Sequence, residues 1–199
     1  MSRHTIILAT HNKHKRDELA AMLGDGGEFD VQVLPDNFPD IEETGTTLEE
    51  NAIIKAEAVF ARLKLPTIAD DTGLVVEALD GAPGVYTARY AGEHATYADN
   101  CRKLLDELEG ATDRVATFKT VLCYIDAAGN RHLVEGRVDG VISNTERGSN
   151  GFGYDPVFEP EEGGGKTFAE LTSEEKNRIS HRARAVLAFS EWMRNRMKS

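Results

Sequence analysis

The sequence predicts a mixed α/β fold in which a β-sheet is flanked by helices. Short apolar runs alternate with segments of helical spacing in the first half of the chain, and two β-rich runs follow at 115–125 and 131–141. A long segment of helical character, 172–197, comes last. Early alternation of strands with helices and a later hairpin are typical of mixed architectures. No shift in composition marks a linker, so we expect a single domain, 1–199, with two lobes around one continuous sheet.

Apolar spacing and helix-start signals locate the elements of the N-terminal half. Residues 5–9 form a short apolar run, which is typical of a buried strand. Thr47 and Glu50 have the spacing of a capping box, a pattern that opens a helix. The segments expected here are a strand over 5–9, a helix from 12 that ends at the glycines 24, 26 and 27, a strand over 31–34, and a helix over 47–63.

Two adjacent carboxylates, Asp70 and Asp71, lie between apolar strand pieces at 67–69 and 74–77. This pattern places them at a strand end where the chain turns. In a straight strand they would point to opposite faces, so one is expected to enter a site and the other to brace it.

The elements expected further along are a helix over 97–109 capped by Thr96, a hairpin of the strands 115–125 and 131–141, and the helical tail over 172–197.

The charge of the chain limits its partners. Among 199 residues, 34 acidic and 23 basic side chains give a net charge of −11. Nucleic acid is disfavoured as a partner, because its binding depends on neutralising phosphates with Lys and Arg. Residues 166–199 differ, with eight Lys or Arg against four acidic residues. On charge alone, a solvated helix surface is the favoured explanation of the tail. Local basic clusters on an acidic chain nevertheless suit a small, multiply charged anion.

The sequence also indicates a compartment. The apolar run at 5–9 is far shorter than a secretion signal or the roughly 20 residues of a membrane helix. Cys101 and Cys123 form no Cys-x-x-Cys motif, so neither a disulfide framework nor a metal site is expected from them. We therefore expect a cytoplasmic protein with no membrane partner.

A polar, basic segment follows the first strand at the point where a helix begins. A helix start offers backbone N–H groups and a favourable dipole to a bound phosphate. Lys15 adds a point charge, while a helix cap and a surface lysine are the alternative interpretation. The candidate phosphate ligands are Thr10, His11, Asn12, Lys13, His14 and Lys15.

Carboxylates are the candidate metal ligands. Adjacent Asp70 and Asp71 can hold Mg²⁺ through oxygen, with substrate phosphates and waters completing the coordination. Glu43, in the loop before the second helix, is a further carboxylate source. Exposed acidic loops are the alternative for all three. Lys55 lies one turn after Asn51 on the following helix, and its alternative is a surface pair.

The segment 151–156, Gly-Phe-Gly-Tyr-Asp-Pro, combines backbone freedom, aromatic rings and a carboxylate, a mixture that suits a nucleobase.

Three cationic residues follow further on: Lys176, His181 and Arg182. On one continuous helix they could not all face one ligand. We therefore predict that the helix breaks near Ser180 and that a second helix begins at His181 and Arg182. The alternative is one continuous amphipathic helix.

These blocks, in this order, resemble one family: the Ham-type non-standard purine nucleoside triphosphate pyrophosphatases, also called inosine/xanthosine triphosphate pyrophosphatases. The resemblance runs from Thr5 to about Ala185. Thr72 stands where serine is usual and keeps the hydroxyl, and Ala183 replaces a common glycine. The matching segments are THNKHK at 10–15, EETG at 42–45, ENA at 50–52 with Lys55, ADDTGL at 69–74, GAPGVY at 81–86, ARYAG at 88–92, GFGYDP at 151–156 and EKNRISHR at 175–182.

The resemblance implies an elongated mixed β-sheet flanked by helices, with two lobes, a central nucleotide-binding cleft and a homodimer. It implies Mg²⁺-dependent hydrolysis of ITP, dITP and XTP to the monophosphate and pyrophosphate, which cleanses the nucleotide pool. Asp71 and Asp70 would be catalytic, with Asp71 and Glu43 as metal ligands. Lys15, Lys55 and Lys176 would bind the pyrophosphate, and Thr72 the phosphate or sugar. The expected base contacts are stacking on Phe152, a pocket lined by Gly153, Tyr154 and Asp155, and donation by His181 and Arg182 to the 6-oxo group.

Two alternatives to this function stay open from the sequence. A pyrophosphatase of the same chemistry could act on other modified or pyrimidine nucleotides. A nucleotide-binding sensor that never hydrolyses its ligand is the other, although Asp70, Asp71 and Glu43 would repel a triphosphate unless a metal lay between them.

Overall fold

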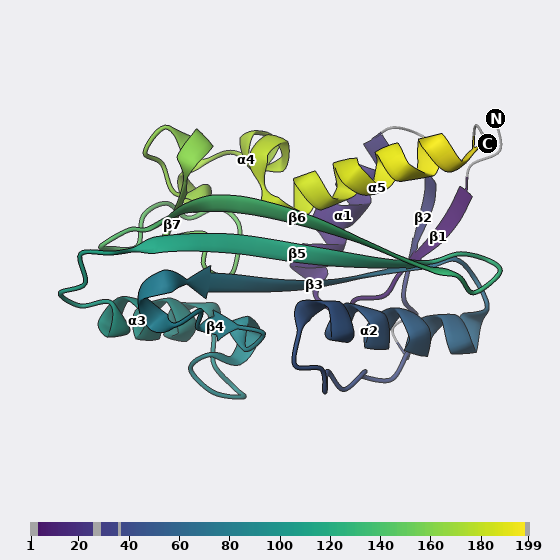
Figure 1. Ribbon diagram of the computed structural model, residues 1–199, viewed down its shortest axis with the longest axis horizontal. Coiled ribbons are helices and arrows are strands. Elements are labelled where there is room, and N and C mark those ends of the chain that lie inside the picture. The colour runs from purple at the N-terminus through teal and green to yellow at the C-terminus, as the bar shows by residue number, and fades with distance from the viewer. Residues whose placement is uncertain (1–3, 26–28, 36, 198–199) are drawn as a thin grey trace. The chain divides into compact units, whose positions relative to one another are not determined.

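The structure is a computed structural model that describes residues 4–25, 29–35 and 37–197 (Figure 1). The predicted end of the first helix at Gly26 and Gly27 lies outside the described residues. The elements are β1 (His4–Leu8), α1 (Lys13–Asp25), β2 (Phe29–Val33), α2 (Leu48–Leu63), β3 (Thr67–Val76), β4 (Pro83–Gly84), α3 (Tyr97–Glu107), β5 (Val115–Ile125), β6 (Arg131–Ile142), β7 (Phe158–Pro160), α4 (Ser173–Ile179) and α5 (His181–Met197).

The strands form a mixed sheet in the order β2-β1-β3-β5-β6-β7, with β4 paired to β3. β1 runs parallel to β2 and β3, whereas β3 with β4 and β6 with β7 are antiparallel. The short connection between β5 and β6 is closed by Asp126, whose carboxylate accepts from the backbone N–H groups of Ala128 and Asn130. The predicted mixed α/β fold, with a sheet flanked by helices, is therefore confirmed.

The chain divides into two compact units. Unit 1 contains the described residues of 1–71, 120–136 and 182–199, and unit 2 contains 72–119 and 137–181. The boundaries fall inside β3, β5 and β6 and after the first residue of α5, so each unit is discontinuous in sequence. The expectation of a single two-lobed domain with a central cleft stays a prediction.

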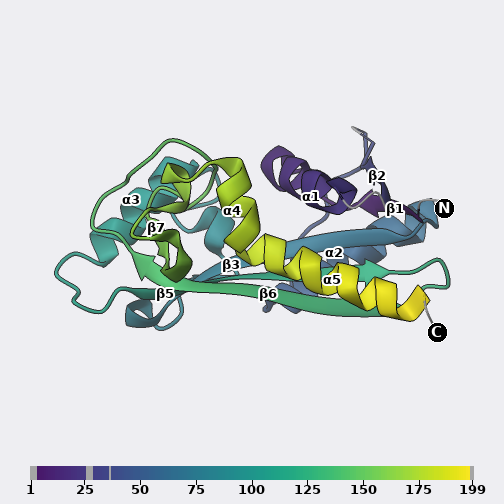
Figure 2. The ribbon, with the colours of Figure 1, turned by 90° about the horizontal axis from the view of Figure 1, so that it is seen from above.

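In unit 1, helices cover both faces of the sheet: α2 lies on one side, and α1 and α5 lie on the other (Figure 1, Figure 2). Successive residues of a strand point to opposite faces. Ile6 and Leu8 of β1 accordingly join Leu19 of α1 and Phe189 of α5 in one buried cluster. At the edge of this cluster the ring of Trp192 stacks on His132, with centroids 3.7 Å apart.

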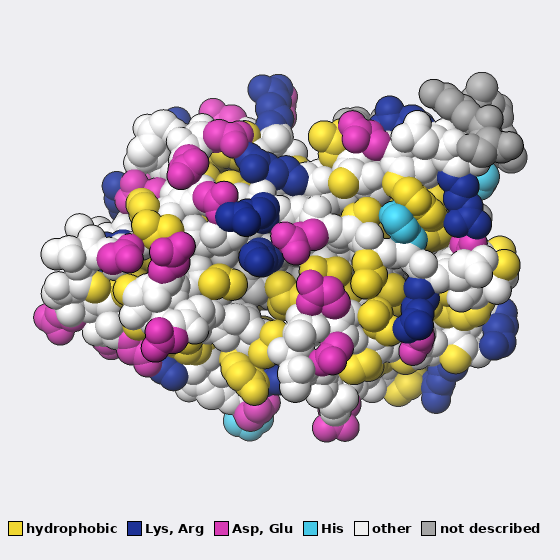
Figure 3. Space-filling model, viewed as in Figure 1, with side chains coloured by type: hydrophobic (Ala, Val, Ile, Leu, Met, Phe, Trp, Pro, Cys, Tyr) yellow, Lys and Arg dark blue, Asp and Glu magenta, His cyan; other side chains and the backbone are white. Residues whose placement is uncertain are grey.

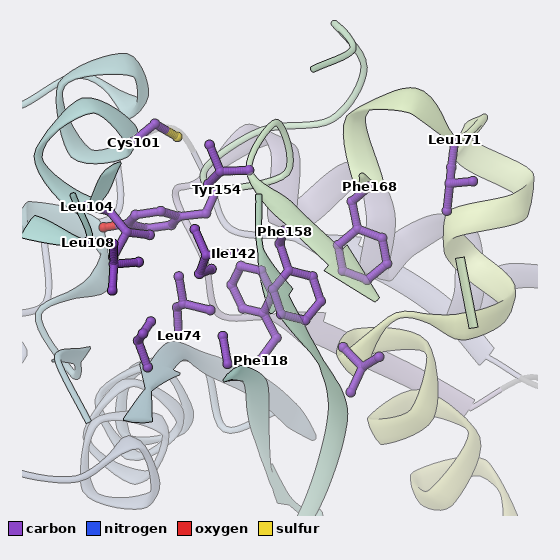
Figure 4. Close-up of a cluster of buried hydrophobic side chains, with 14 residues drawn as sticks. Leu74, Cys101, Leu104, Leu108, Phe118, Ile142, Tyr154, Phe158, Phe168 and Leu171 are labelled. Carbon is purple, nitrogen blue, oxygen red and sulfur yellow. The ribbon is translucent and has the colours of Figure 1, made fainter. Parts of the chain in front are cut away.

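Unit 2 has its own core, which is rich in aromatic rings (Figure 4). The ring of Phe118 on β5 lies edge-on to Phe158, with centroids 4.8 Å apart, and Phe168 packs against both. Leu104 and Leu108, from α3 and the residue that follows it, close the other side of the cluster. This core supports the loop 144–157 that carries the candidate base-binding residues.

Two predicted details of the fold are wrong. Asp70 and Asp71 do not lie at a turn, because β3 runs without interruption from Thr67 to Val76. Both side chains are buried in the middle of the strand, where cationic partners compensate their charge. Gly24 does not end the first helix, since α1 continues to Asp25.

The surface carries charged side chains of both signs. On the face shown in Figure 3, Lys and Arg side chains are interspersed with Asp and Glu. Among the described residues, no helix has the length and apolar character that crossing a membrane requires.

Candidate active site

Asp70 is the centre of a buried ionic cluster in unit 1. The Lys15 ammonium from α1 lies 3.1 Å from Asp70 Oδ2, and the Arg182 guanidinium from α5 lies 3.5 Å from the same oxygen. Arg182 Nη1 also contacts Glu18 Oε2 of α1 at 2.5 Å. Asp70 and Arg182 are almost completely buried. This cluster lies on the face of β3 that packs against α1 and α5.

The cations decide the ionisation of Asp70. Burial alone would raise the pKa of this carboxyl, but the charges of Lys15, Arg182 and Lys55 outweigh it and hold the pKa well below the usual range of an aspartate. Asp70 is therefore an anion near neutral pH, and its neighbours neutralise its charge. Such a group suits a bracing role better than proton transfer.

Asp71, the next residue, points to the opposite face of β3 and contacts α2. The Asn51 amide donates to Asp71 Oδ2 over 3.2 Å, and the Lys55 ammonium donates to Asp71 Oδ1 over 3.0 Å. Asn51 and Lys55 are four residues apart, so they share one face of α2. The prediction that the two carboxylates divide between opposite faces is confirmed by these partners.

Lys55 lies between two carboxylates. Its ammonium donates to Glu43 Oε1 over 2.8 Å as well as to Asp71, so these two acidic side chains converge on one point. Burial raises the pKa of Asp71 and Glu43 adds to the effect, while the charges of Lys55 and Lys15 oppose it. An aspartate with a raised pKa is a stronger proton acceptor than an ordinary one. The alternative of Lys55 as a surface pair is wrong.

The acidic pair fits a magnesium ion. Mg²⁺ prefers oxygen ligands and is commonly held by one or two carboxylates, with waters and substrate phosphates in its remaining positions. Glu43 and Asp71 provide two carboxylates around one cation position, which Lys55 fills. No group of three or more His, Cys, Asp or Glu with metal-site geometry occurs in the described part of the chain. Two carboxylates fill only part of the coordination of Mg²⁺. They therefore suit an ion whose remaining ligands are waters and substrate phosphates.

The start of α1 combines a cap with a cation. The Asn12 carboxamide oxygen accepts from the backbone N–H groups of His14 and Lys15, which makes Asn12 the cap of the helix. Thr10 Oγ1 accepts from the Asn12 N–H over 3.2 Å. Lys15 is only 16% exposed and pairs with Asp70, so the alternative of a surface lysine is wrong.

Three other basic residues of this segment, His11, Lys13 and His14, are exposed. His11 lies 3.4 Å from a carboxylate oxygen of Asp40. A role for them at a phosphate stays a prediction.

In unit 2, Asp155 organises the loop of the GFGYDP segment. Its Oδ2 accepts from the backbone N–H of Phe152 over 2.8 Å. Gly151 is required there, because it has a φ of +75° and an added Cβ would lie 1.9 Å from Asp155 Oδ2. The Phe152 ring is half-buried, so part of it is available to a ligand.

Lys176 contacts this loop. Its ammonium donates to Asp155 Oδ2 over 2.6 Å and lies 4.9 Å from the centre of the Phe152 ring. Lys15 and Lys55 are in unit 1, whereas Lys176 is in unit 2. Lys176 therefore contacts the residues predicted around the base, and its role at the pyrophosphate stays a prediction.

Two other residues predicted around the base, Gly153 and Tyr154, form hydrogen bonds with other parts of the chain. Tyr154 is buried in the core of unit 2, and its hydroxyl donates to the Thr87 carbonyl over 3.0 Å. The Gly153 carbonyl accepts from the Cys101 thiol over 3.3 Å. Thr72 is half-buried in β3. Tyr154 thus supports the loop from within, and contact of these residues with a substrate stays a prediction.

The predicted break in the C-terminal helix is confirmed. α4 ends at Ile179, Ser180 is extended with φ −68° and ψ 156°, and α5 begins at His181. The two residues after the break separate: His181 stacks on Phe118 of unit 2 with centroids 4.6 Å apart, and Arg182 joins the Asp70 cluster of unit 1. The alternative of one continuous helix is wrong.

Sequence reasoning missed Glu18, and it noted Asn51 without assigning it to the site. Glu18 pairs with a residue 164 positions away, and no local pattern signals such a contact. The i,i+4 spacing of Asn51 to Lys55, already noted in the sequence, is the signal that could have assigned Asn51 to the site. Its carbonyl oxygen also accepts from the Gly45 N–H over 2.8 Å, and a Cβ at Gly45 would lie 2.6 Å from that oxygen. This close approach explains the glycine.

Comparison with known proteins decides the family. A sequence model of the Ham1 family matches residues 6–192 of the chain. The chain belongs to the Ham1 family. The family predicted from the ordered motifs is thereby confirmed.

Relatives in this family are similar along nearly their whole length. A dITP/XTP pyrophosphatase of Thermoanaerobacter sp. (strain X514) is 48% identical over 197 residues, which cover 97% of this chain and 98% of the relative. A dITP/XTP pyrophosphatase of Geobacillus kaustophilus is 50% identical over 191 residues, covering 94% and 92%. The Ham1 protein of Staphylococcus aureus has a solved structure with a TM-score of 0.85 and 39% identity, covering 96% of this chain and 99% of that one.

Proposed function

We propose that this chain is a pyrophosphatase for ITP, dITP and XTP, which hydrolyses them to the monophosphate and pyrophosphate and so cleanses the nucleotide pool. Its Ham1 family membership and the names of its relatives support the reaction class. The observation that carries the proposal is the convergence of Asp71 and Glu43 on Lys55. Two carboxylates and a buried cation are the groups that hydrolysis of a phosphoanhydride needs.

In this proposal Asp71 is the general base. A water attacks the α-phosphorus, Asp71 takes its proton, and the bond from the α-phosphorus to the bridging oxygen breaks to release pyrophosphate. The raised pKa of Asp71 favours this assignment over Asp70, whose charge Lys15 and Arg182 already neutralise. Asp70 then keeps Lys15 and β3 in place.

Fixed cations stabilise the leaving group. Lys15 and Lys55 are buried or nearly so, and each is oriented by a carboxylate, so little reorganisation is needed when charge develops on the pyrophosphate. We propose that Thr10, Asn12 and the start of α1 bind phosphate oxygens beside Lys15, with His11, Lys13 and His14 at the exposed end, and that Thr72 binds phosphate or sugar.

Mg²⁺ is the proposed cofactor, held by Asp71 and Glu43. When bound, the ion would neutralise phosphate charge and lower the pKa of a coordinated water.

We also propose that the enzyme is cytoplasmic and forms a homodimer, because the resemblance to the family implies a homodimer. Light scattering on the purified protein tests the dimer, and a monomeric mass at micromolar concentration would refute it.

The loop that we propose to hold the base is in unit 2. Phe152 stacks on the purine, and Gly153, Tyr154, Asp155 and Lys176 hold its loop in position. His181 and Arg182 donate hydrogen bonds to the 6-oxo group of the base. Adenine has an amino group at this position, which is itself a hydrogen-bond donor and cannot accept from them. This mismatch is the physical reason to expect rejection of ATP.

The proposed function is tested with a panel of nucleotides. We expect rapid pyrophosphate release from ITP and XTP, and little from ATP and GTP, when all four are supplied at equal concentration with Mg²⁺. A chelator should abolish the release, because the triphosphate would then lack its counter-charge. Equal cleavage of all four nucleotides would show that the base assignment is wrong. Binding of ITP without cleavage would favour the sensor, and activity on pyrimidine triphosphates alone would favour the other alternative.

Replacing Phe152 tests the stacking role. Phe152→Ala removes the ring but keeps the backbone N–H that Asp155 accepts. We expect a rise in KM for ITP that corresponds to about 1–3 kcal/mol of lost base stacking, with kcat nearly unchanged. Steady-state kinetics measure it, and Phe152→Tyr is the matched control that keeps a ring. A KM equal to that of the wild type would place the base elsewhere.

A further inference from the structure

The backbone around Phe152 does not fix the direction of its ring. Gly151 and Gly153 flank it with φ values of +75° and +65°, a left-handed region that glycine enters at little cost. The Asp155 carboxylate holds the Phe152 backbone N–H, but this hydrogen bond leaves the direction of the ring open. The ring therefore depends on contacts from outside the loop.

Helix α3 supplies two of these contacts. The ring of Tyr97 lies against that of Phe152, with centroids 5.9 Å apart and planes tilted by 49°. Cys101, four residues later and on the same face of α3, donates its thiol hydrogen to the Gly153 carbonyl over 3.3 Å. One face of α3 thus contacts both the ring and the backbone of the loop.

Tyr97 is held on a rigid element. It is the first residue of α3, directly after the cap Thr96. Thr96 and Asp99 form a complete capping box, in which the Thr96 side chain accepts from the Asp99 N–H and the Asp99 carboxylate accepts from the Thr96 N–H. A side chain at this position has a fixed origin, which is what a residue that orients a neighbouring ring requires.

The Tyr97 side chain does not belong to the buried aromatic cluster of unit 2. It is 37% exposed, and its described ring contact is with Phe152. On another side of Phe152 the ammonium of Lys176, itself paired with Asp155, lies within cation–π distance. Phe152 is therefore contacted by an aromatic ring and a cation that are each anchored elsewhere.

We propose that Tyr97 is a positioning residue for base recognition, which holds the Phe152 ring in the orientation that stacks on a purine. The proposal rests on the proposed function, since it assigns a role within the same base pocket. An aromatic pair of this kind changes an equilibrium roughly two- to tenfold. Tyr97 acts through Phe152 and takes no part in the hydrolysis.

A double-mutant cycle tests this role. We expect Tyr97→Ala to raise KM for ITP roughly two- to tenfold, with kcat unchanged. Tyr97→Phe, which keeps the ring, should match the wild type. In the Phe152→Ala background, Tyr97→Ala should have no further effect, because the ring that it positions is already gone. Affinity for inorganic triphosphate, which has no base, should be the same in all variants.

Three results would overturn the proposal: an unchanged KM for Tyr97→Ala, additive effects in the double variant, or an equal loss of affinity for inorganic triphosphate. The affinity for ITP is also measured by calorimetry without metal. If the wild type bound ITP but did not hydrolyse it, the proposed function would fail while the cycle still tested Tyr97. If it bound no ITP, both would fail.

Discussion

Asp71→Asn is expected to lower kcat for ITP by about 10³-fold or more, because it removes the proposed base and one of two metal carboxylates together. Asparagine has nearly the same shape and keeps an oxygen that can accept from Asn51. The substitution therefore removes charge and basicity with little change in packing. Pyrophosphate release under saturating ITP and Mg²⁺ measures the loss.

Binding separates a chemical defect from a folding defect in this variant. Asp71 faces the expected triphosphate with negative charge, so its neutralisation should leave the affinity for ITP without metal intact or increase it. Lys55→Met, which removes the cation between Asp71 and Glu43, should instead weaken that affinity. A wild-type rate for Asp71→Asn would show that the base is another group.

Asp70→Asn is expected to be the most destabilising of the conservative substitutions at the site. The change leaves Lys15 and Arg182 buried without the carboxylate that neutralises them, and removing one partner of a buried ion pair costs about 3–5 kcal/mol. Urea denaturation at neutral pH measures the difference in the free energy of unfolding. Asp17→Asn, on the exposed side of α1, is a matched control that should stay within about 0.5 kcal/mol of the wild type.

The pH dependence of this difference has a definite sign. The pKa of Asp70 is lower in the folded chain than the usual value of about 3.9. Its stabilising effect is therefore fully present above that value and is lost as the pH falls below it, towards the folded pKa. The gap between the wild type and Asp70→Asn should be constant near neutrality and shrink in strong acid. A gap that grows in acid would contradict the ionic origin.

Local sequence patterns predicted most of the elements of the fold. The capping signals at Thr47 and Thr96 and the hairpin around Asp126 are short-range features, and each has the predicted structure. The uninterrupted β3 was not predicted, because two adjacent aspartates resemble a loop unless their cationic partners are known. Those partners come from α1, α2 and α5, so only the tertiary structure reveals why the strand continues.

The sequence predicted which residue types form the site better than it predicted which side chains contact one another. The helix break at Ser180 followed from the angular separation of three cations around one helix axis. The partner of Lys176 did not follow, because both pyrophosphate and a nearby carboxylate attract an ammonium group. Its short contact with Asp155 is formed across 21 residues and depends on how the loop folds.

Trp192 has a practical consequence for these experiments. It is the single tryptophan of the chain and lies in unit 1, stacked on His132 with Arg196 nearby. Its fluorescence will therefore report the unfolding of the unit that contains Asp70, whereas circular dichroism reports both units together. Burial and the charge of Arg196 hold the pKa of His132 below its usual range. An emission change in mildly acidic buffer should thus be assigned to His132 protonation before it is taken as loss of structure.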